Sequence, residues 1–290
     1  MPTNIGLKVS NMKFENGLNQ KTDLSVVIRC GRSREGLLRC MDSIDVPVEV
    51  VASVADDADF IDEIRGIKVA PHRYGNWSIA AEAGIKESTH NDIIVMDSDS
   101  VFAPGAIAII NQSLKMGNLV VQPTVIFLND GSRVSKLISN SRTHENRYEP
   151  KSYSPGLGLK RRELIDVIGE EGNIYHPEVR FGDDGYLDQK IKAAGVPIFV
   201  SQEAVIYHDP IDLKHELRTA FQFGRSEAQI ERVGNKCPDL WNQIQTGYFT
   251  EGAKEYYQTA MEKYGWDTAL FIAFWRMFYL SGYEYEKSAK

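Results

Sequence analysis

Short apolar runs alternate with amphipathic stretches through the first hundred residues, and this alternation limits the possible folds more than any other feature. Two stretches between the runs, 34–44 and 78–88, carry apolar or small residues at helical spacing. The pattern predicts an α/β fold with a mostly parallel sheet sandwiched by helices. The predicted strands are residues 24–28, 46–54, 67–70 and 92–96.

The second half of the chain is less regular. Residues 129–153 are polar with few apolar anchors, and we expect a loop there. Residues from 213 onward have a helical pattern rich in aromatic side chains. The remaining predictions are strands at 119–128 and 198–207 and helices at 162–168 and 184–194, the first helix being opened by Gly156-Leu-Gly-Leu159. We expect a polar N-terminal segment (1–23), an α/β domain (24–210) and a helical C-terminal extension (211–290).

Charge and cysteine content exclude several classes of protein. The chain carries 33 Lys and Arg against 40 Asp and Glu, a net charge of −7, which argues against duplex nucleic acid as a partner. Its 3 cysteines form no CxxC pair, so we expect neither a disulfide framework nor a zinc site. No apolar run approaches the ~20 residues that a membrane-spanning helix needs. We therefore expect a cytoplasmic protein.

Acidic residues follow two of the predicted strands. Asp56 and Asp57 follow the second strand, and Asp97-Ser98-Asp99 follows the fourth. Ligands of such sheets bind at the carboxyl ends of the strands, where these acids lie. Two carboxylates at this spacing suit Mg²⁺ or Mn²⁺ with diphosphate oxygens as further ligands. The alternative is an ordinary turn, in which Asp and Ser are common.

Two further features could carry chemistry. Asp183 and Asp184 open a predicted helix, where acids either cap the helix or, in the functional interpretation, provide a general base at Asp184. His208 ends a predicted strand and is either a structural residue or a metal ligand.

The acids after the fourth strand, the acid pair and the strand-end histidine follow one another along the chain. In this order the sequence resembles the family 2 glycosyltransferases with the GT-A fold. The resemblance covers about residues 24–210, which would divide into a nucleotide-binding half (24–100) and an acceptor-binding half (101–210). The matching segments are residues 24–28, Asp97-Ser98-Asp99, Gly156-Leu-Gly-Leu-Lys-Arg-Arg-Glu163, Gly182-Asp183-Asp184 and Tyr207-His208.

The resemblance implies a metal-dependent, inverting transfer of a sugar from a nucleoside-diphosphate sugar, by default a UDP-sugar, to a hydroxyl acceptor. It implies that Asp97 contacts the sugar nucleotide and that Asp99 binds Mn²⁺ or Mg²⁺, with His208 as a further ligand. It also implies that Asp184 deprotonates the acceptor hydroxyl while Asp183 orients the helix.

The resemblance places the base and ribose near Arg29 and near Asp56 or Asp57, with Ser98 beside them. This chain departs from the family where Ala81-Glu82 replaces an Arg-Asn pair, and where the acid pair is Asp-Asp rather than Glu-Asp. Arg29 and Arg73 could compensate by binding phosphate, for which a guanidinium group is well suited.

Two other functions stay open at this point. A sugar nucleotidyltransferase has a related fold and would show a Gly-rich basic loop after the first strand, which residues 31–36 faintly resemble. The other function is a non-catalytic nucleotide-sugar-binding module. Such a module would not need a general base, so the presence of Asp184 together with Asp97, Asp99 and His208 argues against it.

The acceptor could be a glycan, a lipid-linked glycan or another hydroxyl compound. Near the C-terminus, aromatic side chains at helical spacing predict one apolar helix face. We expect it to pack on the core or in a homodimer rather than to attach weakly to a membrane. These residues are Phe271, Phe274, Trp275, Phe278 and Tyr279.

Overall fold

A computed structural model describes residues 22–64, 67–148, 150–169, 172–234 and 251–289. The predicted N-terminal segment therefore lies almost wholly outside the described residues. The strands are β1 (Leu24–Cys30), β2 (Glu49–Ala55), β3 (Lys68–His72), β4 (Asp92–Asp97), β5 (Ser100–Phe102), β6 (Val120–Phe127), β7 (Leu157–Lys160) and β8 (Ile198–His208). The α-helices are α1 (Arg34–Asp42), α2 (Trp77–Glu87), α3 (Ala106–Lys115), α4 (Arg133–Tyr148), α5 (Arg161–Ile168), α6 (Asp183–Ala193), α7 (Leu213–Arg232), α9 (Glu251–Tyr264) and α10 (Trp266–Ser288).

The strands of the described residues form one sheet in the order β3-β2-β1-β4-β7-β6-β8-β5. The first four strands along the chain are parallel to one another, as the alternating pattern predicts. β7 is antiparallel to both of its neighbours, and β5 is antiparallel to β8. The predicted α/β class is confirmed, and the carboxyl ends of β1, β2 and β4 lie at one edge of the sheet.

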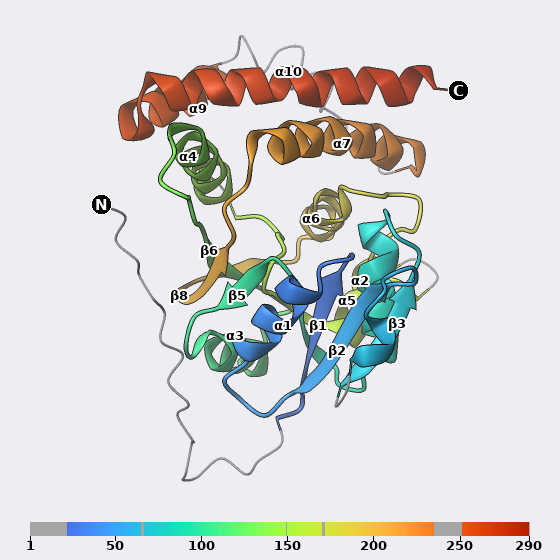
Figure 1. Cartoon of the computed structure of the whole chain (residues 1–290). Helices are drawn as coiled ribbons and strands as arrows, with labels where there is room; N and C mark the ends of the chain where they lie inside the picture. Colours follow the sequence, from blue (N-terminus) through green and yellow to red (C-terminus); the bar gives the residue numbers. More distant parts are fainter. Residues whose placement is uncertain (1–21, 65–66, 149, 170–171, 235–250, 290) are drawn as a thin grey trace.

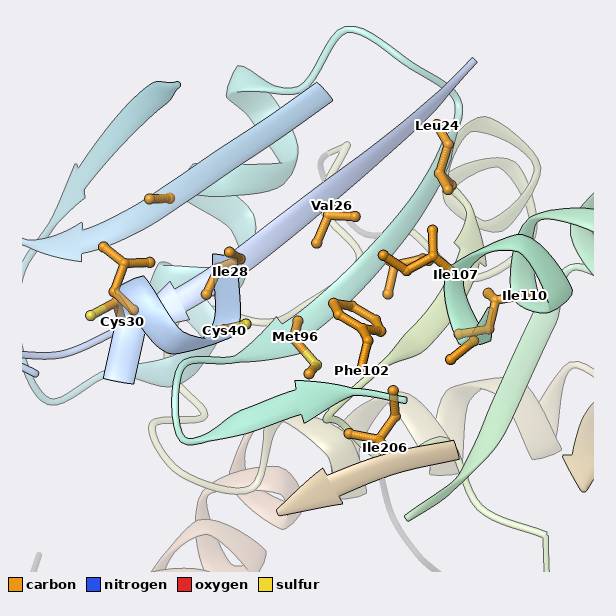
Figure 2. Close-up of a cluster of buried hydrophobic side chains, with 14 of the residues drawn as sticks. Leu24, Val26, Ile28, Cys30, Cys40, Met96, Phe102, Ile107, Ile110 and Ile206 are labelled. Carbon is orange, nitrogen blue, oxygen red and sulfur yellow. The ribbon is translucent and has the colours of Figure 1, made fainter. Parts of the chain in front are cut away.

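Apolar side chains cover both faces of the sheet. One cluster combines alternate residues of β1 with α1, α3 and residues of β8, and Figure 2 shows Val26, Ile28, Phe102 and Ile206 meeting there. A second cluster lies on the opposite face, against α2 and α5. Because successive strand residues point to opposite faces, a strand buried on both sides has to be apolar along its whole length. β1 is wholly buried and follows this rule except at Ser25 and Arg29, whose side chains donate to Glu49 and to Asp97 and Asp183.

Three expectations about the second half are wrong or incomplete. The stretch 129–153 contains the helix α4, whose inward face carries polar side chains and therefore lacks the apolar periodicity of a core helix. Arg142 of α4 is buried and donates two hydrogen bonds to Glu216 Oε2, at 2.8 and 3.2 Å. Residues 157–160 form β7, not the start of a helix, and the three-residue strand β5 was not predicted.

Two long helices form an outer layer over α4 and α6, with α10 outermost and α7 beneath it (Figure 1). Glycines bring them close together, because a Cβ at Gly224 would lie 1.8 Å from the carbonyl oxygen of Tyr279. The predicted aromatic face of α10 is divided between two sides: Phe271 and Tyr279 are buried, whereas Phe274 is 44% exposed. None of the helices in the described part of the chain has the length and apolar content needed to cross a bilayer.

Candidate active site

Arg29 joins three of the elements that meet at the carboxyl edge of the sheet. It lies near the end of β1, opposite Asp97 at the end of β4. Its Nε and Nη2 atoms are each 2.8 Å from Asp97 Oδ1, and its Nη1 donates to Asp183 Oδ2 at the start of α6. The Arg29 side chain is only 4% exposed. This buried guanidinium therefore ties the Asp-x-Asp segment to the acid pair, which lies 154 residues from Arg29 in the chain.

The cluster around Arg29 contains more carboxylates than cations. Burial raises the pKa of Asp97 and of Asp183, and the charge of Arg29 opposes this shift at both carboxyls. Burial lowers the pKa of Arg29, but Asp183 and Asp97 raise it well above its ordinary value, so Arg29 stays charged. One cation thus faces three acids, counting Asp184, and a second cation bound nearby would stabilise the charged forms of these carboxyls.

Asp184 is the least compensated acid of the cluster. Burial and the charge of Asp183 raise its pKa well above the ordinary value. Its Oδ1 atom is buried without a hydrogen-bond partner among the described residues, as are Ser154 Oγ and Tyr175 Oη. The backbone N–H of Ser154 and the ring of Tyr175 interact with the Asp184 carboxylate. A carboxylate with a raised pKa and an unfilled acceptor binds a proton more tightly than an ordinary aspartate, as a general base requires.

Strand pairing brings Asp99 and His208 together. β5 and β8 pair Ser100 with His208, and the backbone N–H of Asp209 donates to the Asp99 carbonyl at 3.0 Å. His208 Nδ1 is 2.8 Å from the Asp209 carbonyl oxygen, which can only accept, so Nδ1 carries the proton. The other ring nitrogen, Nε2, lies 3.7 Å from Asp99 Oδ1.

Asp99 and His208 fit the requirements of a divalent cation. An imidazole whose second nitrogen donates to a carbonyl is the usual state of a metal-binding histidine. The Asp99 side chain is 52% exposed, which leaves room for ligands from a substrate. Asp97 is turned toward Arg29 instead, and no set of three or more His, Cys, Asp or Glu in the described part of the chain is placed to hold a metal. The protein would therefore supply few ligands, which suits Mg²⁺ or Mn²⁺ bridged to phosphate oxygens.

The other predicted residues lie further out. Asp56 and Asp57 are exposed after β2, and Arg73 is exposed after β3. Asp57 is paired with Arg32, which lowers its pKa, and the Arg32 guanidinium lies 4.1 Å above the ring of Tyr74. These groups form an exposed polar and aromatic surface beside the buried cluster. Burial lowers the pKa of the neighbouring His72, and the charge of Asp56 opposes this shift.

Ser98 connects this surface to the cluster, because its backbone N–H donates to the Arg29 carbonyl at 3.0 Å. It lies directly between the two acids that point in different directions, Asp97 inward and Asp99 outward.

Sequence reasoning missed two supports of the acid pair. Glu82 is buried in α2 and accepts hydrogen bonds from the backbone N–H groups of Ile174 and Tyr175, at 2.6 and 2.7 Å. It therefore fixes the segment that carries Tyr175 next to Asp184. A charged residue within a helix face of alanine and glycine is the signal that could have identified this support.

The second support comes from α7. Ser226 Oγ accepts from the backbone N–H of Phe181 at 3.1 Å, and Gln229 Oε1 accepts from that of Arg180 at 3.0 Å. These bonds hold the two residues that lead into α6, so the C-terminal extension helps to position the acid pair.

Solved structures with the same arrangement of elements are glycosyltransferases. The mannosyltransferase PcManGT from Pyrobaculum calidifontis, in complex with GDP-Man and Mn²⁺, is similar with a TM-score of 0.57 and 14% identity over 93% of this chain and 88% of that chain. TarS from S. aureus, in complex with UDP-GlcNAc, is similar with a TM-score of 0.50 and 13% identity over 91% and 90%. No protein-family model and no curated protein matches the sequence. The resemblance drawn from the sequence is thus confirmed at the level of structure: the chain has the fold of the GT-A glycosyltransferases.

Proposed function

We propose that the protein is a metal-dependent, inverting glycosyltransferase that moves a sugar from a nucleoside-diphosphate sugar to a hydroxyl acceptor. The observation that carries the proposal is the convergence of Asp97, Asp183 and Asp184 on Arg29, beside Asp99 and His208. The structures of similar fold contain GDP-Man or UDP-GlcNAc, which supports a sugar nucleotide as the donor. A UDP-sugar is the default donor.

In this proposal Asp184 is the general base. A neutral hydroxyl is a poor nucleophile, and its proton has to leave while the new glycosidic bond forms. The raised pKa of Asp184 matches this task, because a base acts best when its pKa lies near the working pH. Asp183, held by Arg29, would fix the first turn of α6 and so the direction in which Asp184 points. A single attack from the face opposite the leaving group inverts the configuration of the sugar.

The cation would be held by Asp99 and His208, with Asp97 contributing to the charge of the site. Bound there, Mn²⁺ or Mg²⁺ would neutralise the charge that develops on the leaving diphosphate. The Mn²⁺ in PcManGT is consistent with a divalent ion in this fold. The excess of carboxyls over cations around Arg29 is a reason of this chain's own, since a bound cation would offset the burial that raises the pKa of Asp97 and of Asp184.

We propose that the donor's base and ribose lie along the exposed surface at the ends of β1, β2 and β3. Asp56 or Asp57 would accept from the base, Arg73 would meet phosphate, and Ser98 with Arg29 would border the sugar nucleotide. We further propose that residues 24–100 bind the nucleotide and residues 101–210 form most of the acceptor side. The glycan or other hydroxyl acceptor would then approach from the side of α4.

A screen of UDP-, GDP- and dTDP-sugars for thermal stabilisation with and without Mn²⁺ tests the proposal. We expect one donor class to raise the melting temperature only when Mn²⁺ is present. Asp99→Ala should abolish this Mn²⁺-dependent rise. The matched control is Asp166→Ala, which removes an exposed acid on α5, away from the site. His208→Ala should weaken the Mn²⁺ dependence without abolishing donor binding.

Product analysis separates the alternatives. Full transfer in EDTA would contradict the metal dependence, and retained anomeric configuration would contradict the inverting mechanism. Formation of a nucleotide sugar from a sugar phosphate and a nucleoside triphosphate would instead identify a nucleotidyltransferase.

A further inference from the structure

The outermost helix, α10, has a largely exposed apolar face. The exposed fractions of its large side chains there are between 44% and 68%. At the C-terminal end of this face, Tyr285 lies against Phe221 and Arg225 of α7. The other exposed large apolar residues are scattered singly over different elements, as is normal for a protein surface. The residues of this face, which we call the outer stripe, are Trp266, Leu270, Phe274, Met277 and Tyr285.

The outer stripe is distinct from the face that holds α10 in place. Phe271, Tyr279 and Tyr283 are buried on the opposite side, where the hydroxyl groups of Tyr279 and Tyr283 donate to Glu227 and Glu231 of α7. Trp275 stacks on Tyr279 with ring centroids 5.7 Å apart. Steps of four, four and three residues keep the first four members of the stripe on one side of the helix. The helix is thus anchored through one face and offers the other to a partner (Figure 1).

The charges around the stripe argue against a lipid surface as this partner. An interfacial helix binds anionic lipid through Lys and Arg flanking its apolar face. The exposed ionisable residues beside the stripe include the acids Asp267 and Glu284. The nearby bases are engaged elsewhere, since Arg276 is directed to Glu145 and Lys287 to Glu231.

The spacing of the stripe is self-complementary. Four of its five members are arranged symmetrically about a point between residues 275 and 276, so that position 266 mirrors 285 and 274 mirrors 277. The fifth member, Leu270, mirrors the exposed Ser281, which is not part of the stripe. In an antiparallel pair of such helices, Trp266 would meet Tyr285 of the partner subunit and Phe274 would meet Met277 of the partner subunit. Both are favourable pairs, aromatic on aromatic and thioether on aromatic. Leu270 would fit against the small Ser281 of the partner subunit.

The one unfavourable pairing has a neighbouring charge to offset it. Asp267 would face Glu284 of the partner subunit, and two acids repel each other. Arg133 at the start of α4 is paired with Asp267, and its side chain is 79% exposed. In the dimer its guanidinium could pair with both acids. The next residue along α4, Val134, is 40% exposed and would add apolar surface.

From these observations we infer that the protein forms a two-fold symmetric homodimer through the outer stripe, with the two α10 helices antiparallel. A C₂ interface uses the same surface on both subunits, which is what the mirrored spacing provides. The stripe is about 28 Å long, short for an interface of the usual ~800 Å² per partner. The dimer should therefore dissociate on dilution.

Sedimentation equilibrium over a range of protein concentrations tests the dimer. Met277→Glu should weaken dimerisation at least about tenfold, because it places a charge at the centre of the contact. The matched control is Met116→Glu, since Met116 is 65% exposed and Met277 63%, but Met116 lies on the far end of α3. Circular dichroism of both variants checks that they fold. A wild-type protein that is monomeric at all concentrations, or a dimer unchanged by Met277→Glu, would overturn the inference.

Cysteine cross-linking tests the orientation. A mixture of Trp266→Cys and Tyr285→Cys should form a disulfide-linked dimer, whereas Trp266→Cys alone should not, because the two copies of residue 266 lie about 28 Å apart. Cross-linking of Trp266→Cys with itself would contradict the antiparallel arrangement. Flotation with phosphatidylcholine–phosphatidylserine vesicles gives a further check, since binding that Met277→Glu abolishes would assign the stripe to a membrane instead.

Discussion

Two neighbouring groups of charges lie at the carboxyl edge of the sheet, and they differ in how they are balanced. In the inner group, Arg29 is buried and faces three acids, two of which it contacts directly. In the outer group, Arg32 and Asp57 are paired one to one, with side chains 56% and 50% exposed. Water screens the outer pair, so its members exchange partners at little cost. The inner group has no such freedom.

This difference means that the fold fixes the inner group in place, whereas a ligand can rearrange the side chains of the outer group. A buried charge without a partner is costly, so the position of Arg29 is coupled to the integrity of β1, β4 and α6 together. The exposed pair can open toward a bound nucleotide without disturbing the core. In the proposed function, the inner acids would supply fixed chemistry, and the outer groups would supply adaptable recognition of the donor.

Removal of the inner cation should have the largest effect. Arg29→Met leaves buried acids uncompensated and should lower the free energy of unfolding by about 3–5 kcal/mol. Urea denaturation measures this change. If the single variant is too unstable to purify, Arg29→Met combined with Asp183→Asn should recover part of the stability, because it removes one of the uncompensated acids. An Arg29→Met protein as stable as the wild type would show that the inner group is not held by this cation.

Neutralising the proposed base should separate stability from activity. Asp184→Asn should transfer sugar at least ~10²-fold more slowly while the affinity for donor and metal stays near that of the wild type. Because the pKa of Asp184 is raised in the folded protein, the charged form is disfavoured by folding. The substitution should therefore not destabilise the protein at neutral pH. Normal transfer by Asp184→Asn together with an inactive Asp183→Asn would identify Asp183, and not Asp184, as the base.

A second buried acid far from the sheet edge extends the comparison to the outer helices. Burial raises the pKa of Glu227, between α7 and α10, to about 7, whereas Arg225 and Arg232 lower the pKa of the nearby Glu286. The stability contributed by protonated Glu227 is complete below the ordinary pKa of 4.5 and is lost as the pH rises through 7. Glu227→Gln should remove this loss and stabilise the protein at pH 8 by about 2 kcal/mol.

Thermal unfolding at pH 5 and pH 8 measures the effect of Glu227→Gln. We expect little difference from the wild type at pH 5 and a higher melting temperature at pH 8. Glu286→Gln should do the opposite and lower stability at pH 8, since it breaks pairs with two arginines. The same sign for both variants would contradict the assignment of a protonated Glu227.

Substitution in the outer pair should have the smallest effect on folding. Arg32→Met and Asp57→Asn should leave the free energy of unfolding unchanged, because both side chains are exposed. If the donor's base lies on this surface, Asp57→Asn should instead raise the Kd for the donor, and calorimetric titration measures this. A loss of stability equal to that of Arg29→Met would contradict the division into inner and outer groups.

The sequence predicts the parts of the fold that local pattern specifies. β1 and β4 are largely apolar, and the acids at the ends of β2 and β4 mark the edge of the sheet at which the candidate site forms. The order of Asp-x-Asp, acid pair and strand–His was sufficient to predict the fold. The metal, base and nucleotide roles of these residues stay predictions.

The features that were missed depend on partners distant in the sequence. β5 has three residues and exists because β8 pairs with it, and β7 contains Gly158, where a Cβ would meet Ile110 of α3 at 2.6 Å. α4 lacks apolar periodicity because its inward side bonds to Glu216 of α7. The partners of Arg29 come from two distant elements, β4 and α6, and no local pattern identifies them.

The two hydrogen bonds from α7 to the segment before α6 have a consequence for how such a chain could diversify. Ser226 and Gln229 hold Arg180 and Phe181, and the helix that starts two residues later carries Asp184. Division of the chain at residue 211 would therefore separate α7 from the segment before α6, to which these two hydrogen bonds tie it. Grafting the last eighty residues of a relative onto this sheet would shift the proposed base along with the surface that accompanies it. If the proposed function holds, the C-terminal helices would influence the position of the base and could not be exchanged as an independent accessory.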